Sequence, residues 1–216
     1  MKKNKKFIYL ISPKKIKNNI FYNDLVSVFK SKKVSFFQLR LKKERSKKII
    51  NIGKKINKIC KRFNVKLIIN DNPLLAKKIG ADGCHLGQSD SKVFEARKIL
   101  KNKIIGVTCH NSKKLIKKAI YDKVDYVALG AFYPTKTKKV KFRAKIKLIK
   151  EAKKITKIPI VAIGGINLRN YKKLLLNKAN FLAISSYIWN NKKYKPLKAT
   201  LKLKWRYLET KLELVC

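Results

Sequence analysis

The sequence is poor in acidic residues, in paired cysteines and in long apolar runs, and each shortage excludes a class of protein. Only 11 of its 216 residues are Asp or Glu, against 57 Lys and Arg, so the formal net charge is +46. The cysteines form no CxxC pair and lack zinc-finger spacing, which predicts reduced thiols and a cytoplasmic location; they are Cys60, Cys84, Cys109 and Cys216. No apolar run approaches the roughly 20 residues of a membrane span, so we expect no membrane association.

The excess of positive charge, taken alone, would suggest a nucleic-acid or anionic membrane partner. The lysines, however, are spread over nearly every segment, mostly on the polar faces of helical patterns, and form no single dense block. Ile and Asn are also abundant, as an A-rich coding bias would produce. We therefore expect no specific nucleic-acid partner, and we expect binding to unrelated DNA to disappear by physiological salt.

Short apolar runs alternate with amphipathic stretches along the chain. Eight runs have the length and composition of buried strands, at residues 7–11, 34–39, 67–69, 84–86, 104–108, 126–130, 158–163 and 181–186. Between them, apolar residues three and four positions apart predict helices. This pattern predicts an α/β fold, a (β/α)8 TIM barrel in a single domain spanning 1–216, with 190–216 as a C-terminal helix and tail. An open doubly wound sheet is the alternative, but no GxGxxG follows the first strand, which disfavours its dinucleotide-binding version.

A weak internal repeat favours the barrel. Ala81-Asp82, Val124-Asp125 and Ala179-Asn180 each join a helix end and a polar turn residue to the buried strand that follows. We expect Asp82 to fix the turn into its strand rather than to bind a ligand.

Polar residues follow seven of the predicted strands, and in a barrel these positions share the active-site face. In chain order they are Arg40 and Lys42, Asn70 and Asp71, Gln88 and Asp90, Thr108 and His110, Thr135, Thr137 and Lys138, Gly164 and Gly165, and Ser185 and Ser186. The glycines and serines after the last two strands suit a phosphate group. Two carboxylates among cations suit a diphosphate chelated by magnesium. The residues therefore predict an enzyme that joins two phosphorylated small molecules, one of them a diphosphate.

Several ordered motifs, each at a predicted strand end, resemble those of the thiamine-phosphate synthase and thiazole tautomerase family. They run from about Val34 to Trp189 and are QLRLK (38–42), IND (69–71), ADGCHLGQSD (81–90), GVTCH (106–110), DYVALGAFYPTKTKK (125–139), VAIGGI (161–166) and AISS (183–186). The resemblance implies a TIM-barrel transferase. It also implies Mg²⁺-dependent condensation of 4-amino-2-methyl-5-(diphosphooxymethyl)pyrimidine with thiazole phosphate, giving thiamine monophosphate and diphosphate.

The resemblance also implies roles for individual residues. Asp71 and Asp90 would be the magnesium ligands. The pyrimidine diphosphate would be bound by Gln38, Arg40, Lys42, Asn70, Thr108 and Lys138, of which Arg40, Thr108 and Lys138 would be catalytic. The thiazole phosphate would be bound by Thr135, Thr137, Gly165, Ser185 and Ser186. No protein nucleophile is required, so catalysis would rest on positioning and electrostatic stabilisation.

Each assignment has a simpler alternative. Asp71 and Asp90 could cap the helices that follow them, and Arg40 and Lys42 could be solvated charges. His85, inside a strand, is more typical of a hydrogen-bonded core histidine than of a catalyst.

His110 follows the fifth strand, where the tautomerase branch of the family uses a histidine as acid and base, so a thiazole tautomerase is the second hypothesis. A non-catalytic, basic nucleic-acid-binding barrel is the third. A tautomerase binds only the thiazole half of the product. The joint presence of Arg40, Asp71, Asp90 and Lys138 therefore favours the synthase.

Overall fold

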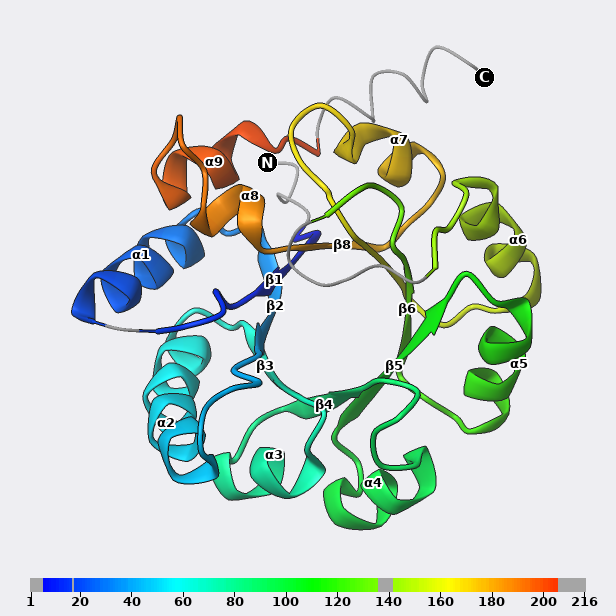
Figure 1. Ribbon diagram of the computed structural model, residues 1–216, viewed down its shortest axis with the longest axis horizontal. Coiled ribbons are helices and arrows are strands. Elements are labelled where there is room, and N and C mark those ends of the chain that lie inside the picture. The colour runs from blue at the N-terminus through cyan, green and yellow to red at the C-terminus, as the bar shows by residue number, and fades with distance from the viewer. Residues whose placement is uncertain (1–5, 17, 136–141, 206–216) are drawn as a thin grey trace.

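The computed structural model describes residues 6–16, 18–135 and 142–205, and in it eight parallel strands close into a barrel in the order β1 to β8. The strands are β1 (Ile8–Ile11), β2 (Val34–Leu39), β3 (Lys66–Asn70), β4 (Gly83–Leu86), β5 (Ile104–His110), β6 (Tyr126–Gly130), β7 (Ile160–Ile163) and β8 (Phe181–Ile184). Helices surround them (Figure 1): α1 (Asn19–Lys30), α2 (Ser46–Arg62), α3 (Pro73–Ile79), α4 (Val93–Leu100), α5 (Lys113–Tyr121), α6 (Lys147–Ile155), α7 (Tyr171–Leu176), α8 (Ser186–Trp189) and α9 (Pro196–Lys202). The closed barrel confirms the predicted fold class over the open sheet.

The strands read as nearly continuous apolar runs because both of their faces are buried. Outward-facing residues such as Leu10, Phe37 and Leu67 pack against the helices and form the main core. A smaller cluster that includes Tyr9, Ile68, Tyr126, Ala128 and Val161 fills the barrel interior. The interior is thus a packed core, and in a barrel of this kind ligands bind at the loops that follow the carboxyl ends of the strands.

The ends of α3 follow local sequence signals. The Asn72 side chain accepts a hydrogen bond from the Leu75 N–H at 3.0 Å, Pro73 occupies the first turn, and Gly80 ends the helix with a left-handed φ of 71°. Ser112 caps α5 in the same way. These signals place the start of each helix directly after the polar residues of the barrel rim.

Three predicted strand boundaries were wrong by two residues. β5 runs to His110 rather than ending at Thr108, β7 begins at Ile160 rather than at residue 158, and β8 ends at Ile184, so Ser185 and Ser186 lie outside the strand. Ser185 instead precedes α8, and its carbonyl accepts hydrogen bonds from the N–H groups of Ile188 and Trp189. The chain therefore turns away from the barrel at these two serines.

The internal repeat corresponds to three equivalent pairs of hydrogen bonds near the amino-terminal ends of strands, and we call each pair a clamp. Asp82, Asp125 and Asn180 accept hydrogen bonds from the N–H groups of Leu67, Ile105 and Ile160, each at 2.8 Å. Each acceptor's own N–H donates back to the carbonyl of the same residue, at 2.8 to 2.9 Å. Each acceptor also contacts a cation, which is Lys66, Arg97 or Lys153 respectively. The repeat thus joins β3 to β4, β5 to β6 and β7 to β8, and the prediction that Asp82 fixes a turn is confirmed.

We expect Asp125→Ala to lower the free energy of unfolding by about 1–3 kcal/mol, because it leaves the N–H of the fully buried Ile105 without its carboxylate partner. Asp125→Asn should lose less than about 1 kcal/mol, since Asn180 performs the same task between β7 and β8 with an amide oxygen. Urea denaturation measures both changes. Asp122→Ala, which removes only an exposed ion pair with Lys118, is the control; equal losses in the Asp122 and Asp125 alanine variants would contradict the clamp.

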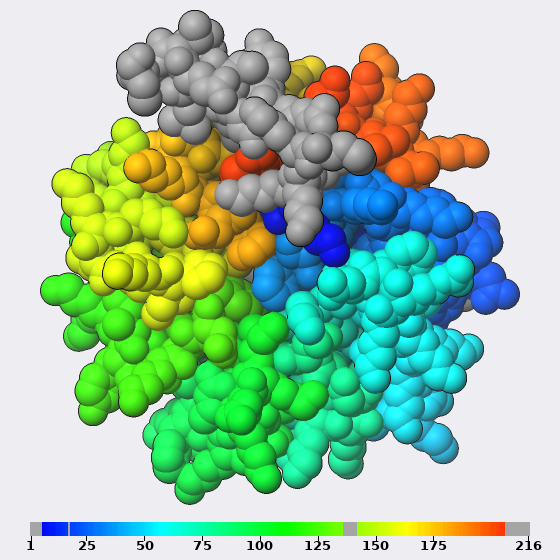
Figure 2. All heavy atoms as spheres, turned by 180° about the vertical axis from the view of Figure 1, so that it is seen from behind, coloured from blue at the N-terminus to red at the C-terminus, as the bar shows by residue number. Residues whose placement is uncertain are grey.

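The C-terminal elements close the ring beside α1. Figure 1 shows α8 and α9 next to α1, and Lys33 joins them by donating to the carbonyls of Leu201 and Leu203 at 2.9 and 2.6 Å. Seen from behind, the start of the described chain lies near the centre of the face, among segments from distant parts of the sequence (Figure 2). α9 falls within the predicted C-terminal helix and tail, whereas residues 206–216 lie outside the described residues.

Two expectations from composition concern membranes and thiols. Among the helices that the structure describes, none has the length and apolar character needed to cross a membrane. Cys60, Cys84 and Cys109 are free and buried, as predicted for reduced thiols, and Cys216 lies outside the described residues.

Candidate active site

Asp71 stands at the carboxyl end of β3 in a conformation that aims it at the barrel mouth. Its φ is 66°, in the left-handed region, and its N–H donates to the carbonyl of His85 on the neighbouring strand at 2.8 Å. Its carboxylate pairs with Lys42 Nζ at 2.7 Å. Two residues that the sequence placed after different strands, Lys42 and Asp71, are therefore brought into direct contact.

Asp90 meets Asp71 at the same rim. The two carboxyl groups are in hydrogen-bonding contact, and Asp90 Oδ2 also accepts from the Gly87 N–H at 2.6 Å. A Cβ on residue 87 would lie 2.8 Å from that oxygen, so glycine suits the position. Neither acid caps a helix, because Asn72 caps α3 and Lys92 holds the N-cap position of α4. The capping alternative is therefore wrong for both residues.

The electrostatics of the acid pair are uneven. Burial and the contact with Asp71 raise the pKa of Asp90. Burial also opposes ionisation of Asp71, but Lys42, the Asp90 contact and Arg40 together hold its pKa below the usual range. Asp71 is thus the more acidic member of the pair.

In the metal-free protein, we expect Asp90→Asn to raise the free energy of unfolding at neutral pH. The folded state raises the pKa of Asp90, so the ionised group destabilises the fold above that pKa, and the penalty disappears as the pH falls below the unfolded-state value of about 4. The gain should therefore shrink in acid, while any stabilisation by Mg²⁺ should be weaker in the variant at neutral pH. Thermal unfolding with and without Mg²⁺ tests this; a metal-free variant less stable than wild type at neutral pH would contradict it.

Arg40 is held at the rim between β1 and β3. The backbone N–H of Arg40 donates to Ser12 Oγ at 3.0 Å. Ser12 lies directly after β1, and its carbonyl accepts a hydrogen bond from Ser185 Oγ at 3.2 Å. Burial lowers the pKa of Arg40, partly offset by the charge of Asp71. Arg40 is therefore not a fully solvated surface charge. Because its guanidinium is already partly buried, an anionic ligand would displace less water when it binds there.

Thr108 lies on β5, two strands along the barrel from β3, and its hydroxyl contacts a side chain of the barrel interior. Its Oγ1 is 2.8 Å from His85 Nε2, and His85 Nδ1 is 2.9 Å from the Tyr126 hydroxyl. Gln88, from the loop after β4, donates to the Thr108 carbonyl. His85 is 8% exposed and hydrogen-bonded through both ring nitrogens, which confirms its prediction as a satisfied core histidine.

The loops after β6 and β7 are joined to each other. The N–H groups of Phe132 and Tyr133 donate to the carbonyls of Ile163 and Gly164 at 3.0 and 3.1 Å. Gly165 has a φ of 63°, and a Cβ there would lie 2.2 Å from the carbonyl oxygen of Pro134. Only glycine fits this close approach, and it brings the Gly165 backbone beside the loop that carries Thr135.

The predicted thiazole-phosphate residues are only partly described. Gly165, Ser185 and Ser186 follow the neighbouring strands β7 and β8, and Thr135 follows β6. Thr137 and Lys138 lie outside the described residues. Asn70, the last residue of β3, lies next to Asp71, and Gln38 is buried on β2 with 3% exposure.

The rim therefore places two carboxylates, cations and the backbone turns after β7 and β8 around one mouth. The family model for thiamine monophosphate synthase matches residues 8–188. Thiamine-phosphate synthase of Pelagibacter ubique is 70% identical over 201 residues, covering 93% of this chain and 97% of that protein. The enzyme of the same name from Nitrosomonas eutropha is 44% identical over 158 residues, covering 73% of this chain and 74% of that protein. The chain belongs to the thiamine monophosphate synthase family.

A solved structure supports the fold of this family member. Thiamine phosphate pyrophosphorylase from Pyrococcus furiosus superposes with a TM-score of 0.81 at 24% identity, covering 98% of each chain. The recognised family and the transferase class predicted from the sequence are confirmed.

Two carboxylates fit the cation that the family resemblance implies. Within the part of the chain that the structure describes, no three His, Cys, Asp or Glu side chains are grouped as a metal site. Mg²⁺ does not need such a group, because it usually binds one or two carboxylates and takes its other ligands from waters and substrate phosphates. Asp71 and Asp90, in contact with each other and uneven in pKa, would relieve their mutual repulsion by binding such an ion.

His110, the residue that raised the tautomerase hypothesis, ends β5 beyond an irregularity in its pairing with β6. Its φ is 51°, and its ring lies 4.8 Å from the ring of Phe142 at a tilt of 43°. The relative that is 70% identical to this chain is a thiamine-phosphate synthase, which favours the synthase over the tautomerase hypothesis.

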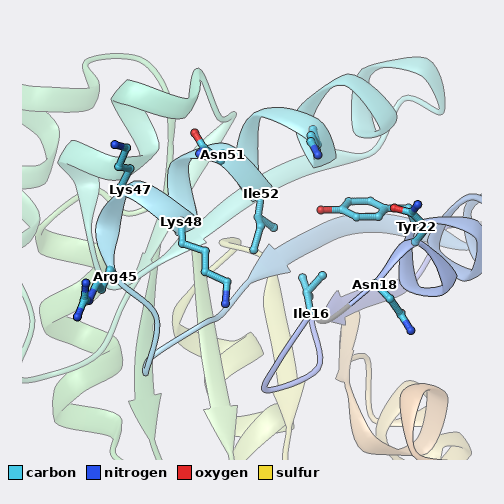
Figure 3. Close-up of a pocket in the computed structure, with 10 residues that line it drawn as sticks. Ile16, Asn18, Tyr22, Arg45, Lys47, Lys48, Asn51 and Ile52 are labelled. Carbon is cyan, nitrogen blue, oxygen red and sulfur yellow. The ribbon is translucent and has the colours of Figure 1, made fainter.

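A basic cavity of about 550 Å³ lies between the starts of α1 and α2, as Figure 3 shows. Tyr22 points across it toward Ile52, and Arg45, Lys47 and Lys48 supply positive charge on the α2 side. None of the residues predicted to bind substrate or metal lines it. We place the reaction at the strand ends rather than in this cavity, because the carboxylates and the family motifs are there.

Sequence reasoning missed Ser12 and the two tyrosines of the barrel interior. Ser12 links Arg40 to Ser185, and its position directly after the first strand was a signal that could have identified it. Tyr9 and Tyr126 gave no comparable signal, because aromatic residues inside strands are ordinary core residues. Their importance comes from the position of their hydroxyl groups, which the sequence does not reveal.

Proposed function

We propose that this protein catalyses the synthase reaction, in which the pyrimidine methylene group is transferred from diphosphate to the nitrogen of thiazole phosphate. The observation that supports the proposal is the contact of Asp71 with both Lys42 and Asp90 beside a partly buried Arg40, a set of groups that suits a diphosphate with a divalent cation. A tautomerase acting on the thiazole half alone would have no use for these groups.

We assign the diphosphate to the β2–β5 side of the mouth. Arg40, Lys42 and Asn70 would bind its oxygens, joined by Lys138 and by the Thr108 hydroxyl, with Gln38 below them toward the pyrimidine. Asp71 and Asp90 would hold Mg²⁺, which when bound supplies positive charge to the leaving diphosphate. The thiazole phosphate would occupy the opposite side, at Thr135, Thr137, Gly165, Ser185 and Ser186.

The chemistry then needs little from the protein beyond position and charge. The bond between the methylene carbon and the diphosphate oxygen breaks, and its electron pair leaves with the diphosphate. Arg40, Lys42 and Lys138 would stabilise that developing charge, while the electron-rich aminopyrimidine stabilises the methylene cation. The thiazole nitrogen donates its lone pair to the methylene carbon. Because the nucleophile belongs to the second substrate, no side chain forms a covalent bond.

The same proposal places the reaction in the cytoplasm, where buried thiols such as Cys60, Cys84 and Cys109 remain reduced. The wide spread of lysines would also attract both anionic substrates toward the protein. We propose no specific nucleic-acid partner.

One assay distinguishes the three functional hypotheses, which are a synthase, a tautomerase and a non-catalytic barrel. The purified protein is given both substrates, with Mg²⁺ or with excess chelator, and thiamine monophosphate is measured; thiazole carboxylate phosphate tautomers are tested in parallel. The synthase predicts product only with Mg²⁺ and no tautomer exchange. Exchange without coupling would support the tautomerase, and neither activity would support a non-catalytic barrel.

A further inference from the structure

A continuous line of hydrogen-bonding groups crosses the barrel interior beneath Thr108. The hydroxyls of Tyr9 (β1) and Tyr126 (β6) are 2.8 Å apart. Tyr126 is 2.9 Å from His85 Nδ1, and His85 Nε2 is 2.8 Å from Thr108 Oγ1. At its far end, the Gln38 side chain lies beside the Tyr9 hydroxyl. Five strands thus contribute one polar group each to a single chain.

Most of the chain is buried. Tyr9, Tyr126 and Gln38 are 2 to 3% exposed, and the rings of His85 and Tyr126 are stacked 5.6 Å apart at 14°. Gly106, opposite Tyr126, leaves room for its ring: a Cβ at that position would lie 1.9 Å from Tyr126 Cζ. In such surroundings hydrogen bonds are strong and polarise one another, and an unmade one is costly.

Each hydroxyl in the chain has one proton to donate. Burial raises the pKa of both Tyr9 and Tyr126 far above neutrality, so both remain phenols. Two orders are then possible: every donor points toward Thr108, or every donor points away from it. The order fixes the tautomer of His85, because a neutral imidazole donates from one nitrogen and accepts at the other.

The order is selected at the mouth of the barrel, because the Gln38 amide at the far end carries both a donor and an acceptor and can match either order. At the mouth, an anionic phosphate oxygen can only accept from Thr108. Thr108 must then accept from His85 Nε2–H, and Tyr126 must donate to Nδ1.

We propose that His85 is a positioning residue, held by Gln38, Tyr9 and Tyr126 in its Nε2–H tautomer so that the Thr108 hydroxyl proton points at the diphosphate. This inference rests on the proposed placement of Thr108 in the diphosphate site. The barrel interior thereby presents a fixed donor to the leaving group, which needs no reorientation when charge develops.

The tautomer can be read directly. The chain has two histidines, so a long-range ¹H–¹⁵N NMR spectrum contains two imidazole patterns, and His110→Gln identifies the one from His85. With inorganic pyrophosphate and Mg²⁺ added to the full-length protein, we expect a protonated Nε2 and an unprotonated Nδ1. A proton on Nδ1, or on both nitrogens, would overturn the proposal even if no variant folds.

The functional consequence is tested with Tyr126→Phe, which removes one hydroxyl from the middle of the chain and keeps the ring. We expect kcat to fall about tenfold, the loss typical of supporting groups around a reactive site, with KM for thiazole phosphate unchanged. The control is Tyr171→Phe, which removes a buried hydroxyl bonded to Lys204 outside the barrel and should leave kcat unchanged. Equal kcat values in the two variants would overturn the proposal.

A double-mutant cycle distinguishes this inference from the site on which it rests. In a Thr108→Val background, Tyr126→Phe should lower kcat no further, because the chain no longer ends in a hydroxyl. If Thr108→Val alone retains wild-type turnover, the placement of Thr108 is wrong. If Thr108→Val loses activity and Tyr126→Phe lowers kcat equally in both backgrounds, the placement stands and the coupling through His85 is wrong.

Discussion

Asp71→Ala will lower kcat for coupling about a thousandfold or more, the scale of losing an electrostatic contact made to the transition state. Asp71 is the more acidic member of the pair, because Lys42, Asp90 and Arg40 together keep its pKa low despite burial. Its removal takes away a proposed metal ligand and also leaves Lys42 without its partner at 2.7 Å. Activity should not return at high substrate concentration, since the missing group acts on the leaving diphosphate rather than on substrate capture alone.

The acid pair allows a graded comparison. Asp90→Ala should lose less activity than Asp71→Ala, because the raised pKa of Asp90 makes loss of its proton, which metal binding requires, less favourable. Asp122→Ala, which changes a partly buried carboxylate that pairs with Lys118 at the end of α5, should leave kcat unchanged. Measuring initial rates against Mg²⁺ concentration for all three variants decides the issue. Saturating turnover close to wild type in Asp71→Ala would show that this residue is not a metal ligand.

The parts of the fold that the sequence predicted are those set by neighbouring residues. Asn72, Pro73 and Gly80 determine α3 within a span of nine positions, and apolar runs buried on both faces marked all eight strands. The boundary of β8 was wrong because no Gly or Pro separates the apolar run from Ser185 and Ser186, which form the start of α8. A strand end depends on where the sheet partner ends, and that partner is far away in sequence.

The candidate site was predictable to the extent that the barrel puts every strand end on one face. That rule placed Asp71 and Asp90 together before any contact was known. It could not show that Lys42 pairs with Asp71, or that His85 lies against Thr108, because both contacts depend on the relative register of neighbouring strands. The position of a residue along its strand predicts the face of the barrel on which it lies. The side chain that it contacts there depends on how neighbouring strands and loops pack.

Gly106→Ala will destabilise the protein by about 3 kcal/mol or more, although it adds a single methyl group. The new Cβ would lie 1.9 Å from Tyr126 Cζ and 2.3 Å from both Cε atoms. The ring cannot move aside, because its hydroxyl is bonded to Tyr9 and His85 and its strand is paired on both sides. Urea denaturation should show a lower midpoint, and turnover should fall because the chain beneath Thr108 is displaced.

A matched glycine substitution separates this clash from a general effect of alanine. Gly53 lies within α2, where a Cβ would meet only side-chain atoms of the buried Ile79, with Cδ1 at 2.6 Å, Cγ1 at 3.0 Å and Cγ2 at 3.1 Å. Alanine is favoured over glycine inside a helix by roughly 0.5–1 kcal/mol, which offsets part of this clash, so Gly53→Ala should cost less stability than Gly106→Ala. Tyr126→Val should partly rescue Gly106→Ala, with the double variant losing less than the sum of the single losses. Strict additivity would show that the Gly106 backbone, and not the approach of the Tyr126 ring, requires glycine.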